Sequence, residues 1–111
     1  MTTKKMATLI IHAPDYRVKD GAKSFEKVIA DGIGEGYAIG QKYISKLPQG
    51  SKVVLLRKDR EKKRAEGTLI RLVPTNRYTP QGIQRYDVHT KGLTVVPFKS
   101  ERLNRFGVAI I

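Results

Sequence analysis

The sequence predicts an α+β fold that is mainly β, a small β-barrel of about six short strands with two short helices inserted after the first strand. Two observations support this prediction. Short apolar runs separated by turn-forming residues extend along most of the chain. Glycines, which allow a sheet to curl, make up 10 of its 111 residues. The length also predicts a single domain over residues 1–111, with one modest core.

The N-terminal part predicts a strand followed by a helix. Residues Met6–Ile11 are rich in aliphatic side chains and bounded by polar ones, as in a buried strand. Residues Ala22–Asp31 place apolar side chains at i, i+3 and i+4, which puts them on one face of a helix. Asp20 or Ser24 is expected to cap its start, and Gly32 fits the left-handed residue that ends it.

A glycine-rich turn is expected next, from Gly34 to Gly40, and it carries Tyr37. The GxGxG spacing is that of a dinucleotide-binding loop, but such a loop follows a strand, whereas a helix precedes this one. We therefore expect the glycines to let the backbone approach another strand or a planar ligand closely. A short helical turn over Gln41–Leu47 follows, and Pro48 ends it.

The centre of the chain predicts a hairpin. Four consecutive apolar residues within Ser51–Leu56 indicate a strand that is covered on both faces. Arg57–Arg64 is too highly charged for a core and is expected at the tip. Ala65–Val73 is expected to return as the second strand, with Gly67 at a bulge. Pro74–Gln84 is rich in turn-forming residues and predicts a long loop.

The C-terminal part predicts further strands. Arg85–Thr90 alternates as in a half-buried strand, the next two residues turn or bulge the chain, and Leu93–Phe98 continues in strand form. Ser100 is expected to cap a single helical turn. Val108–Ile111 is an apolar chain end that must pair, and the N-terminal strand is its natural neighbour.

The charge is the most informative property of the whole chain. Lys and Arg number 22 against 10 Asp and Glu, a formal net charge of +12. Residues 1–50 hold 8 basic and 5 acidic residues, whereas residues 51–111 hold 14 and 5. So large and uneven an excess is typical of proteins that bind a polyanion, so nucleic acid, either DNA or RNA, is the expected partner. A membrane surface is not expected, because we find neither a basic amphipathic helix nor a lipidation signal.

No feature of the sequence requires an oxidising compartment or a membrane. The chain contains no cysteine, which excludes disulfides and thiolate sites. The apolar run near the N-terminus is broken by His12 and Pro14, and it is too short for a signal-peptide core or a membrane span. We therefore expect a cytoplasmic protein.

The cations of the predicted hairpin tip form a candidate phosphate-binding site. Lys and Arg on a protruding hairpin can reach phosphates and release condensed counterions. A solvated turn that only aids solubility is the alternative interpretation. The residues are Arg57, Lys58, Arg60, Lys62, Lys63 and Arg64.

A base pocket is expected in a cleft beside the glycine-rich turn. Aromatic faces with neighbouring cations bind single bases by stacking, and polar groups read the base edge. Tyr43 and Tyr86 lie on apolar faces, as core residues do, whereas tyrosines in loops favour a functional role. The candidates are His12, Tyr37, Gln41, Asn76 and Tyr78.

Catalytic and metal sites have little support. The histidines, His12 and His89, occur without an HxH or HExxH spacing. No serine stands in a nucleophile-elbow context. We therefore assign no catalytic residue, no metal ligand and no cofactor, and we expect a binding protein and not an enzyme.

Four features in this order resemble the PUA-like superfamily, nearest to its EVE and YTH branch. They are the first strand with its helix at Phe25–Ile29, the glycine and aromatic segment Gly34–Gly40, the short helix with the strand Pro48–Leu56, and the return strand Arg64–Pro74. The resemblance spans residues 6–98 and implies a nucleic-acid-binding module, as at the front of modification-dependent restriction proteins. In EVE and YTH relatives, aromatic side chains cage a modified base. Relatives commonly carry Trp near the position of Tyr37, and this chain has no Trp.

The function expected from these observations is a nucleic-acid-binding module. It would accept a base, modified or not, in an aromatic pocket and hold phosphates with the basic hairpin. Two alternatives stay open. Some ASCH-type members of the superfamily have hydrolytic activity, which implies a nucleoside hydrolase with His12 or a carboxylate in a deep pocket. A basic protein-interaction or ribosome-associated module in a larger complex would instead bind free oligonucleotides poorly.

Overall fold

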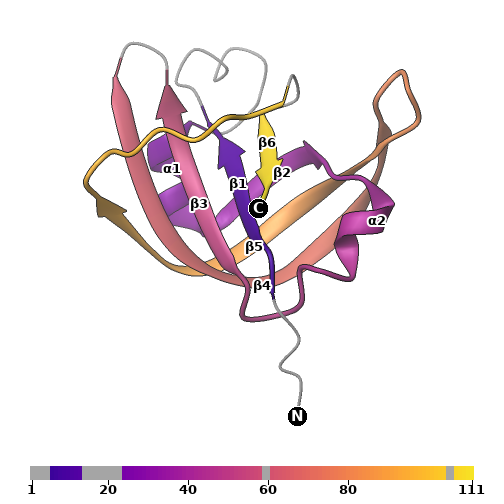
Figure 1. Ribbon diagram of the computed structural model, residues 1–111, viewed down its shortest axis with the longest axis horizontal. Coiled ribbons are helices and arrows are strands. Elements are labelled where there is room, and N and C mark those ends of the chain that lie inside the picture. The colour runs from indigo at the N-terminus through magenta and orange to yellow at the C-terminus, as the bar shows by residue number, and fades with distance from the viewer. Residues whose placement is uncertain (1–5, 14–23, 59–60, 105–106) are drawn as a thin grey trace.

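The computed structural model describes residues 6–13, 24–58, 61–104 and 107–111. They form one six-stranded sheet, in the order β2-β5-β4-β3-β1-β6, and two helices. The sheet is strongly curled, so that it forms half of a barrel (Figure 1). The prediction of a mainly β fold with about six strands is confirmed. The elements are β1 (Thr8–His12), α1 (Phe25–Asp31), β2 (Ile33–Ala38), α2 (Gln41–Ile44), β3 (Lys52–Lys58), β4 (Lys62–Tyr78), β5 (Gln84–Val96) and β6 (Val108–Ile110).

Two of the strands are long, whereas the sequence predicts short ones. β4 has 17 residues and β5 has 13, and the two pair with each other. The long loop predicted over Pro74–Gln84 is wrong, because β4 continues to Tyr78 and the connection to β5 spans only residues 79–83. Pro74 fits within β4 because β3 pairs with β4 only as far as Thr68, and beyond that point β4 is an edge on one side.

Bulges in the two long strands accompany the curl of the sheet. The β4–β5 ladder changes register between Glu66 and Thr68, and again further along the strands. A Cβ atom on Gly67 would lie 2.8 Å from the carbonyl oxygen of Lys91, so glycine is required for this close approach of the two backbones. The bulge predicted at Gly67 is confirmed.

The glycine-rich turn predicted from Gly34 to Gly40 is a strand for most of its length. β2 covers Ile33–Ala38 and pairs with β5. The register shifts between Gly34 and Tyr37, and Gly36 within this bulge has a φ of 74°. The glycines therefore mark an irregular edge strand and not a turn.

The ends of α1 agree with the sequence prediction. The hydroxyl oxygen of Ser24 accepts a hydrogen bond from the N–H of Lys27 at 3.2 Å, and Gly32 ends the helix with a φ of 73°. The placement of both helices after the first strand is wrong for α2, which follows β2. The helical turn predicted after Ser100 is also wrong over residues 97–104, which contain no helix. No helix in the described ranges has the length and apolar character that crossing a bilayer requires.

The first and last strands pair with each other in the sheet. β6 pairs antiparallel with β1, as predicted, and β1 pairs parallel with β3. The outermost strands of the sheet are therefore β2 and β6. Residues of both strands line one groove, so these two edges face each other across the open side of the half-barrel (Figure 1).

β3 is buried on both faces, as its run of apolar residues predicts. Val53 and Leu55 belong to the main core, together with side chains from both helices and the other strands. Val54 and Leu56 belong to a smaller cluster on the opposite face, against which Leu103 packs. The segment 97–104 thus covers the outer face of the sheet where β1 and β3 lie side by side.

Candidate functional site

The β3–β4 hairpin carries the predicted phosphate-binding cations, but they do not form one exposed tip. Arg57 and Arg64 lie within the paired part of β3 and β4, and each has an exposed fraction of only 6%. Their placement at an exposed tip is therefore wrong, because the strands extend further than the charge pattern suggests. The exposed or half-exposed cations are Lys58, Lys62 and Lys63, and Arg60 lies outside the described residues.

One carboxylate of α1 and one of the hairpin itself neutralise part of this hairpin. The Nη1 atom of Arg57 lies 3.6 Å from Oε1 of Glu26 and 3.5 Å from Oε2 of Glu61. The Nζ atom of Lys63 lies 3.0 Å and 2.9 Å from the same two oxygens. The hydrogen bond from Lys63 is the main reason that the pKa of Glu26 is lowered, and the bonds to Glu61 and Glu26 raise the pKa of Lys63.

Arg64 connects β4 to the segment that follows β5, through contacts with Lys99 and Glu101. Its Nε atom lies 2.8 Å from Glu66 Oε2, and its Nη1 atom lies 3.2 Å from Glu101 Oε1. The same Nη1 atom donates a hydrogen bond of 2.9 Å to the carbonyl oxygen of Lys99. Hydrogen bonds from Arg64, and then from Lys52, lower the pKa of Glu66. The guanidinium group is therefore occupied by the protein itself.

Tyr37 is a core residue and not an exposed loop aromatic, so that prediction is wrong. It lies in β2 with an exposed fraction of 7%, and its hydroxyl donates a hydrogen bond of 3.1 Å to the carbonyl oxygen of His12. The absence of a side chain at Gly34 leaves space for the Tyr37 ring, since a Cβ atom at Gly34 would lie 2.8 Å from that ring. The His12 ring accepts a hydrogen bond from the N–H of Lys58 at 3.1 Å. His12 and Tyr37 thus belong to the structural framework of β1, β2 and β3.

Two other predicted base-pocket residues, Gln41 and Tyr78, line the same groove. The groove lies between the start of α2 and the β4–β5 hairpin, and its volume is about 280 Å³. Gln84 and Tyr86 on β5 complete its polar and aromatic lining. Asn76 is exposed on β4 and is not among the residues that line it. We call this feature the Tyr78 groove.

The two tyrosines of the Tyr78 groove have different environments. Tyr78 has an exposed fraction of 58%, whereas Tyr86 has one of 7% and belongs to the main core. The hydroxyl of Tyr86 donates to Oε1 of Gln84 at 3.4 Å, and Nε2 of Gln84 donates to the carbonyl oxygen of Thr75 at 2.9 Å. The groove therefore combines a fixed floor with one tyrosine that is largely exposed to solvent.

The turn after Tyr78 holds that ring on an ordered hairpin. The backbone N–H of Thr79 donates to the carbonyl oxygen of Ile83 at 2.9 Å, and the N–H of Ile83 donates to the Thr79 hydroxyl at 3.1 Å. The N–H of Gly82 donates to the carbonyl oxygen of Thr79 at 2.9 Å. Three hydrogen bonds within five residues close the turn, which limits the freedom of the preceding strand end.

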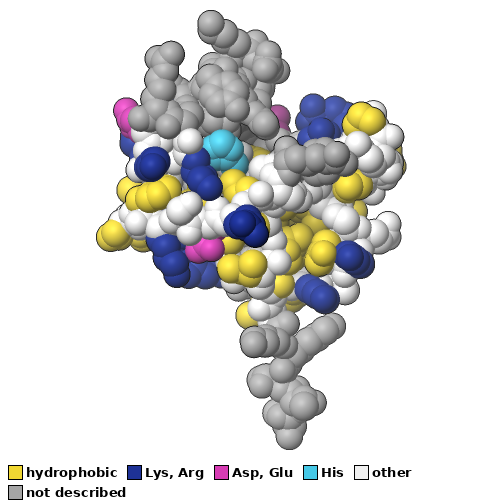
Figure 2. Space-filling model, turned by 45° about the horizontal axis from the view of Figure 1, so that its top comes forward, with side chains coloured by type: hydrophobic (Ala, Val, Ile, Leu, Met, Phe, Trp, Pro, Cys, Tyr) yellow, Lys and Arg dark blue, Asp and Glu magenta, His cyan; other side chains and the backbone are white. Residues whose placement is uncertain are grey.

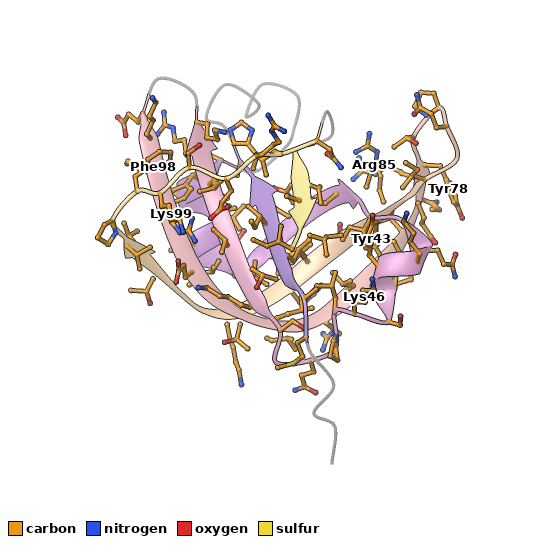
Figure 3. The ribbon with its side chains drawn as sticks, in the orientation of Figure 1. Tyr43, Lys46, Tyr78, Arg85, Phe98 and Lys99 are labelled. Atoms are coloured by element: carbon orange, nitrogen blue, oxygen red, sulfur yellow. The ribbon has the colours of Figure 1, made fainter. Side chains whose placement is uncertain are left out.

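Arg77 and Arg85 meet over the backbone of Gly36. Nη1 of Arg85 donates a hydrogen bond of 2.9 Å to the carbonyl oxygen of Gly36, and a Cβ atom on Gly36 would lie 2.5 Å from Nη2 of Arg77. The N–H of Gly36 donates to the carboxylate of Asp87 at 3.0 Å. Figure 3 shows Arg85 and Tyr78 near the same end of the molecule. The hairpin that carries the exposed ring thus also carries two guanidinium groups.

Two lysines of the α2 region add positive charge. The Nζ atoms of Lys42 and Lys46 lie 5.0 Å and 5.8 Å from the centre of the Tyr43 ring, within the range of cation–π contacts. Figure 2 shows Lys and Arg side chains around an apolar area on one face of the molecule. This end of the sheet therefore combines exposed aromatic surface with Arg and Lys.

Sequence reasoning offers Arg77 and Arg85 only as residues that could extend the basic patch, and it does not place them beside the base-pocket candidates. The signal that could have found them is a repeated dipeptide, Arg77-Tyr78 and Arg85-Tyr86, on the two sides of the turn. In a hairpin these pairs come together, but the predicted long loop hides that relation. The hairpin is recognisable only once β4 is seen to continue to Tyr78.

A metal site has no support in the described ranges, where no group of three or more His, Asp and Glu side chains could hold an ion. His12 lines neither the Tyr78 groove nor the groove between β2 and β6. No protein-family model and no curated protein matches the chain. The candidate site is therefore defined by its own geometry.

Proposed function

We propose that the protein is a nucleic-acid-binding module that takes single-stranded nucleic acid at the end of the sheet formed by the Tyr78 groove, Arg77 and Arg85. The observation that carries this proposal is the exposed ring of Tyr78 on a hairpin whose other face carries two guanidinium groups. A mainly β half-barrel of this order of elements is also compatible with a PUA-like fold, which we propose on the resemblance of the sequence. Modules of that superfamily bind nucleic acids, which agrees with the proposed role.

A base would stack on Tyr78. The face of an aromatic ring contributes about 1–3 kcal/mol per stacked base, and every base has a face that can use it. The ring of Tyr78 is more than half exposed, with an exposed fraction of 58%, so no rearrangement of the core is needed for this contact. Duplex DNA hides its base faces, and this favours a single strand or a flipped base.

The amide of Gln41 would read the edge of the stacked base. Gln41 is exposed at the start of α2 and lines the Tyr78 groove. Its side chain offers both a donor and an acceptor, which is what a base edge requires. Gln84 also lines the groove, but its amide is held by Thr75 and Tyr86 and serves to shape the floor.

Arg77 and Arg85 would hold the phosphates of the nucleotides next to that base. Successive residues of a strand point to opposite faces, so Arg77 and Tyr78 lie on two sides of one narrow hairpin. A nucleic-acid strand that crosses the hairpin would contact the ring on one side and the guanidinium groups on the other. Such contacts release counterions and make the affinity fall with salt.

The test is the binding of fluorescein-labelled single-stranded oligonucleotides, DNA and RNA, measured by fluorescence anisotropy at several salt concentrations. Tyr78→Ala is expected to weaken binding by about 5- to 150-fold, because about 1–3 kcal/mol of stacking is lost. Phe98→Ala is the matched control, since Phe98 is also an exposed aromatic residue but lies outside the groove. Equal effects of the two substitutions, or no binding by the unaltered protein, would contradict the proposal.

A further inference from the structure

We infer that the seam between β2 and β6 binds an extended peptide whose apolar and acidic side chains alternate. The seam is a groove of about 320 Å³, to which each side contributes three consecutive residues, Ala38–Gly40 and Val108–Ile110. It lies across the segment Ile39–Gly40 from the Tyr78 groove, because these two residues line both. This inference does not rest on the proposed nucleic-acid function.

The backbone of β6 presents an unused donor and acceptor to the seam. Thr8 and Ile111 exchange two hydrogen bonds, of 2.8 Å and 3.0 Å, so the antiparallel ladder turns the N–H and C=O of Ile110 away from β1. The backbone N–H and C=O of Val108 also point away from β1. The N–H donates to Oδ1 of Asn104, and the C=O accepts from the backbone N–H of Asn104. No described residue does the same for Ile110, which leaves one position of the β6 edge open.

The backbone of β2 presents a second such position. The N–H of Ile39 donates to the carbonyl oxygen of Gln84 at 3.3 Å, so the alternation of the ladder turns the N–H and C=O of Ala38 away from β5. Ala38 and Ile110 both line the seam, which places a free strand edge on each side of it. An inserted strand would pair with both edges and continue the sheet around the barrel.

The chemistry of these groups favours a peptide over a nucleic acid. A peptide strand supplies N–H donors for the two carbonyl groups and C=O acceptors for the two N–H groups. A phosphodiester backbone supplies acceptors alone, and it would leave the carbonyl groups of Ala38 and Ile110 unpaired. The backbone pattern of the seam therefore selects for a polypeptide.

The side chains around the seam define the composition of that peptide. Ile39, Leu103 and Ile110 make its wall apolar, while Arg102 also lines it and is exposed. The ring of Tyr43 lines the seam as well, and Lys42 and Lys46 lie over that ring. Because the side chains of a strand alternate between faces, one face would carry apolar groups and the other would carry carboxylates.

The experiment uses an acetylated and amidated pentapeptide of alternating glutamate and valine, added to the ¹⁵N-labelled full chain and followed by NMR. We expect concentration-dependent shifts of the amide signals of Ala38 and Ile110, and slower hydrogen exchange at both. Two probes of the same length serve as comparisons. One has N-methylated valines and lacks the donors that face one of the two edges, and the other has lysine in place of glutamate. Both are expected to bind at least about fivefold more weakly.

Charge-reversal variants distinguish binding at the seam from non-specific electrostatic binding of an acidic peptide to a basic protein. Arg102→Glu is expected to weaken binding of the glutamate peptide by about fivefold or more, whereas Lys99→Glu makes the same charge change outside the seam and is expected to have little effect. The inference is overturned if the two amides do not shift at millimolar peptide or if the N-methylated peptide binds equally well. It is also overturned if the two charge variants behave alike, or if an oligonucleotide shifts these amides and the peptide does not.

Discussion

The two hairpins of this protein differ in a way that their sequences do not suggest. The β3–β4 hairpin includes the most basic stretch of the chain, yet Glu26 and Glu61 lie within 4 Å of its cations Arg57 and Lys63. Near its turn the β4–β5 hairpin carries Arg77 and Arg85, whose guanidinium groups lie against the backbone of Gly36. Its exposed aromatic ring has no counterpart among the exposed hydrophobic residues of the first hairpin.

The comparison teaches that positive charge in a sequence is not the same as a positive field on a surface. Glu26 reaches the β3–β4 hairpin from α1, and Glu101 reaches Arg64 from the segment that follows β5. Folding therefore places distant carboxylates against the very cations that dominate the sequence. Arg77 and Arg85 lie at the other hairpin, where the charge pattern is less conspicuous, and they are the cations of the proposed binding site.

The largest expected effect concerns the stability that Arg64 provides. Arg64→Ala removes a buried guanidinium group and leaves Glu101 and Glu66 without this partner, which we expect to lower the free energy of unfolding by about 3 kcal/mol. Urea denaturation followed by circular dichroism measures it. Lys62→Ala is the matched control on the same strand, and its exposed side chain predicts a change of about 0.5 kcal/mol or less. Similar losses in the two variants would show that Arg64 is not a structural residue.

The next effect compares the two hairpins as binding surfaces. Arg77→Gln with Arg85→Gln removes two cations, and for a single strand the slope of log affinity against log salt is expected to fall by about 1.4. At 0.15 M salt this corresponds to about a tenfold loss of affinity. Lys58→Gln with Lys62→Gln removes the same charge from the β3–β4 hairpin and is expected to leave the slope nearly unchanged. A larger loss of affinity from the lysine pair would indicate that the phosphates bind at the β3–β4 hairpin.

The elements that the sequence predicts well are those specified by neighbouring residues. The run Val53–Leu56, the cap at Ser24 and the left-handed stop at Gly32 each act within one turn or one strand, and all three agree with the structure. The pairing of the last strand with the first also follows, because an apolar chain end has few other places to pack. Local pattern was sufficient for these features.

The features that the sequence does not predict depend on contacts between distant segments. β2 is a strand in spite of its glycines because β5 supplies its ladder, and Gly34 is small because the ring of Tyr37 lies over it. Pro74 suggests a loop, but the open edge of β4 accommodates it within a strand. The sequence identifies Gln41 and Tyr78 as base-pocket candidates. It offers Arg77 and Arg85 only as possible extensions of the basic patch, and the register of β4 and β5 brings them to the same hairpin as Tyr78.

A smaller effect tests whether Gly36 supports the arginine pair. Gly36→Ala forces a side chain into a left-handed conformation, with a φ of 74°, and is expected to cost about 1 kcal/mol of stability. It also pushes against Arg77, so we expect about a threefold loss of oligonucleotide affinity. Gly50→Ala is the control, because Gly50 has a φ of 96° with no atom within 4 Å of the added Cβ. It should share the loss of stability, measured by urea denaturation, and keep the affinity. Equal affinities of the two variants would show that Gly36 does not help to position Arg77 and Arg85 for binding.

The smallest effect concerns the acids that neutralise the β3–β4 hairpin. The pKa of Glu26 is lowered from its ordinary value of 4.5, first by the hydrogen bond from Lys63. Because the folded-state pKa lies below the unfolded one, this contribution to stability is complete above about pH 4.5. It is then lost as the pH falls through the folded-state pKa. Glu66 follows the same rule with Arg64 as its first partner.

Glu26→Gln therefore should reduce the dependence of stability on pH below about 4.5, without changing the sign of that dependence. The change is expected to be small, because Glu26 is exposed and its ion pairs are screened by solvent. Urea denaturation at intervals between pH 3 and pH 6 measures it, and added salt should shrink the difference between the two proteins. A steeper loss of stability in the variant would mean that Glu26 opposes the fold. The carboxylates near the β3–β4 hairpin would then destabilise the folded protein. The difference in charge neutralisation between the two hairpins would need another physical cause.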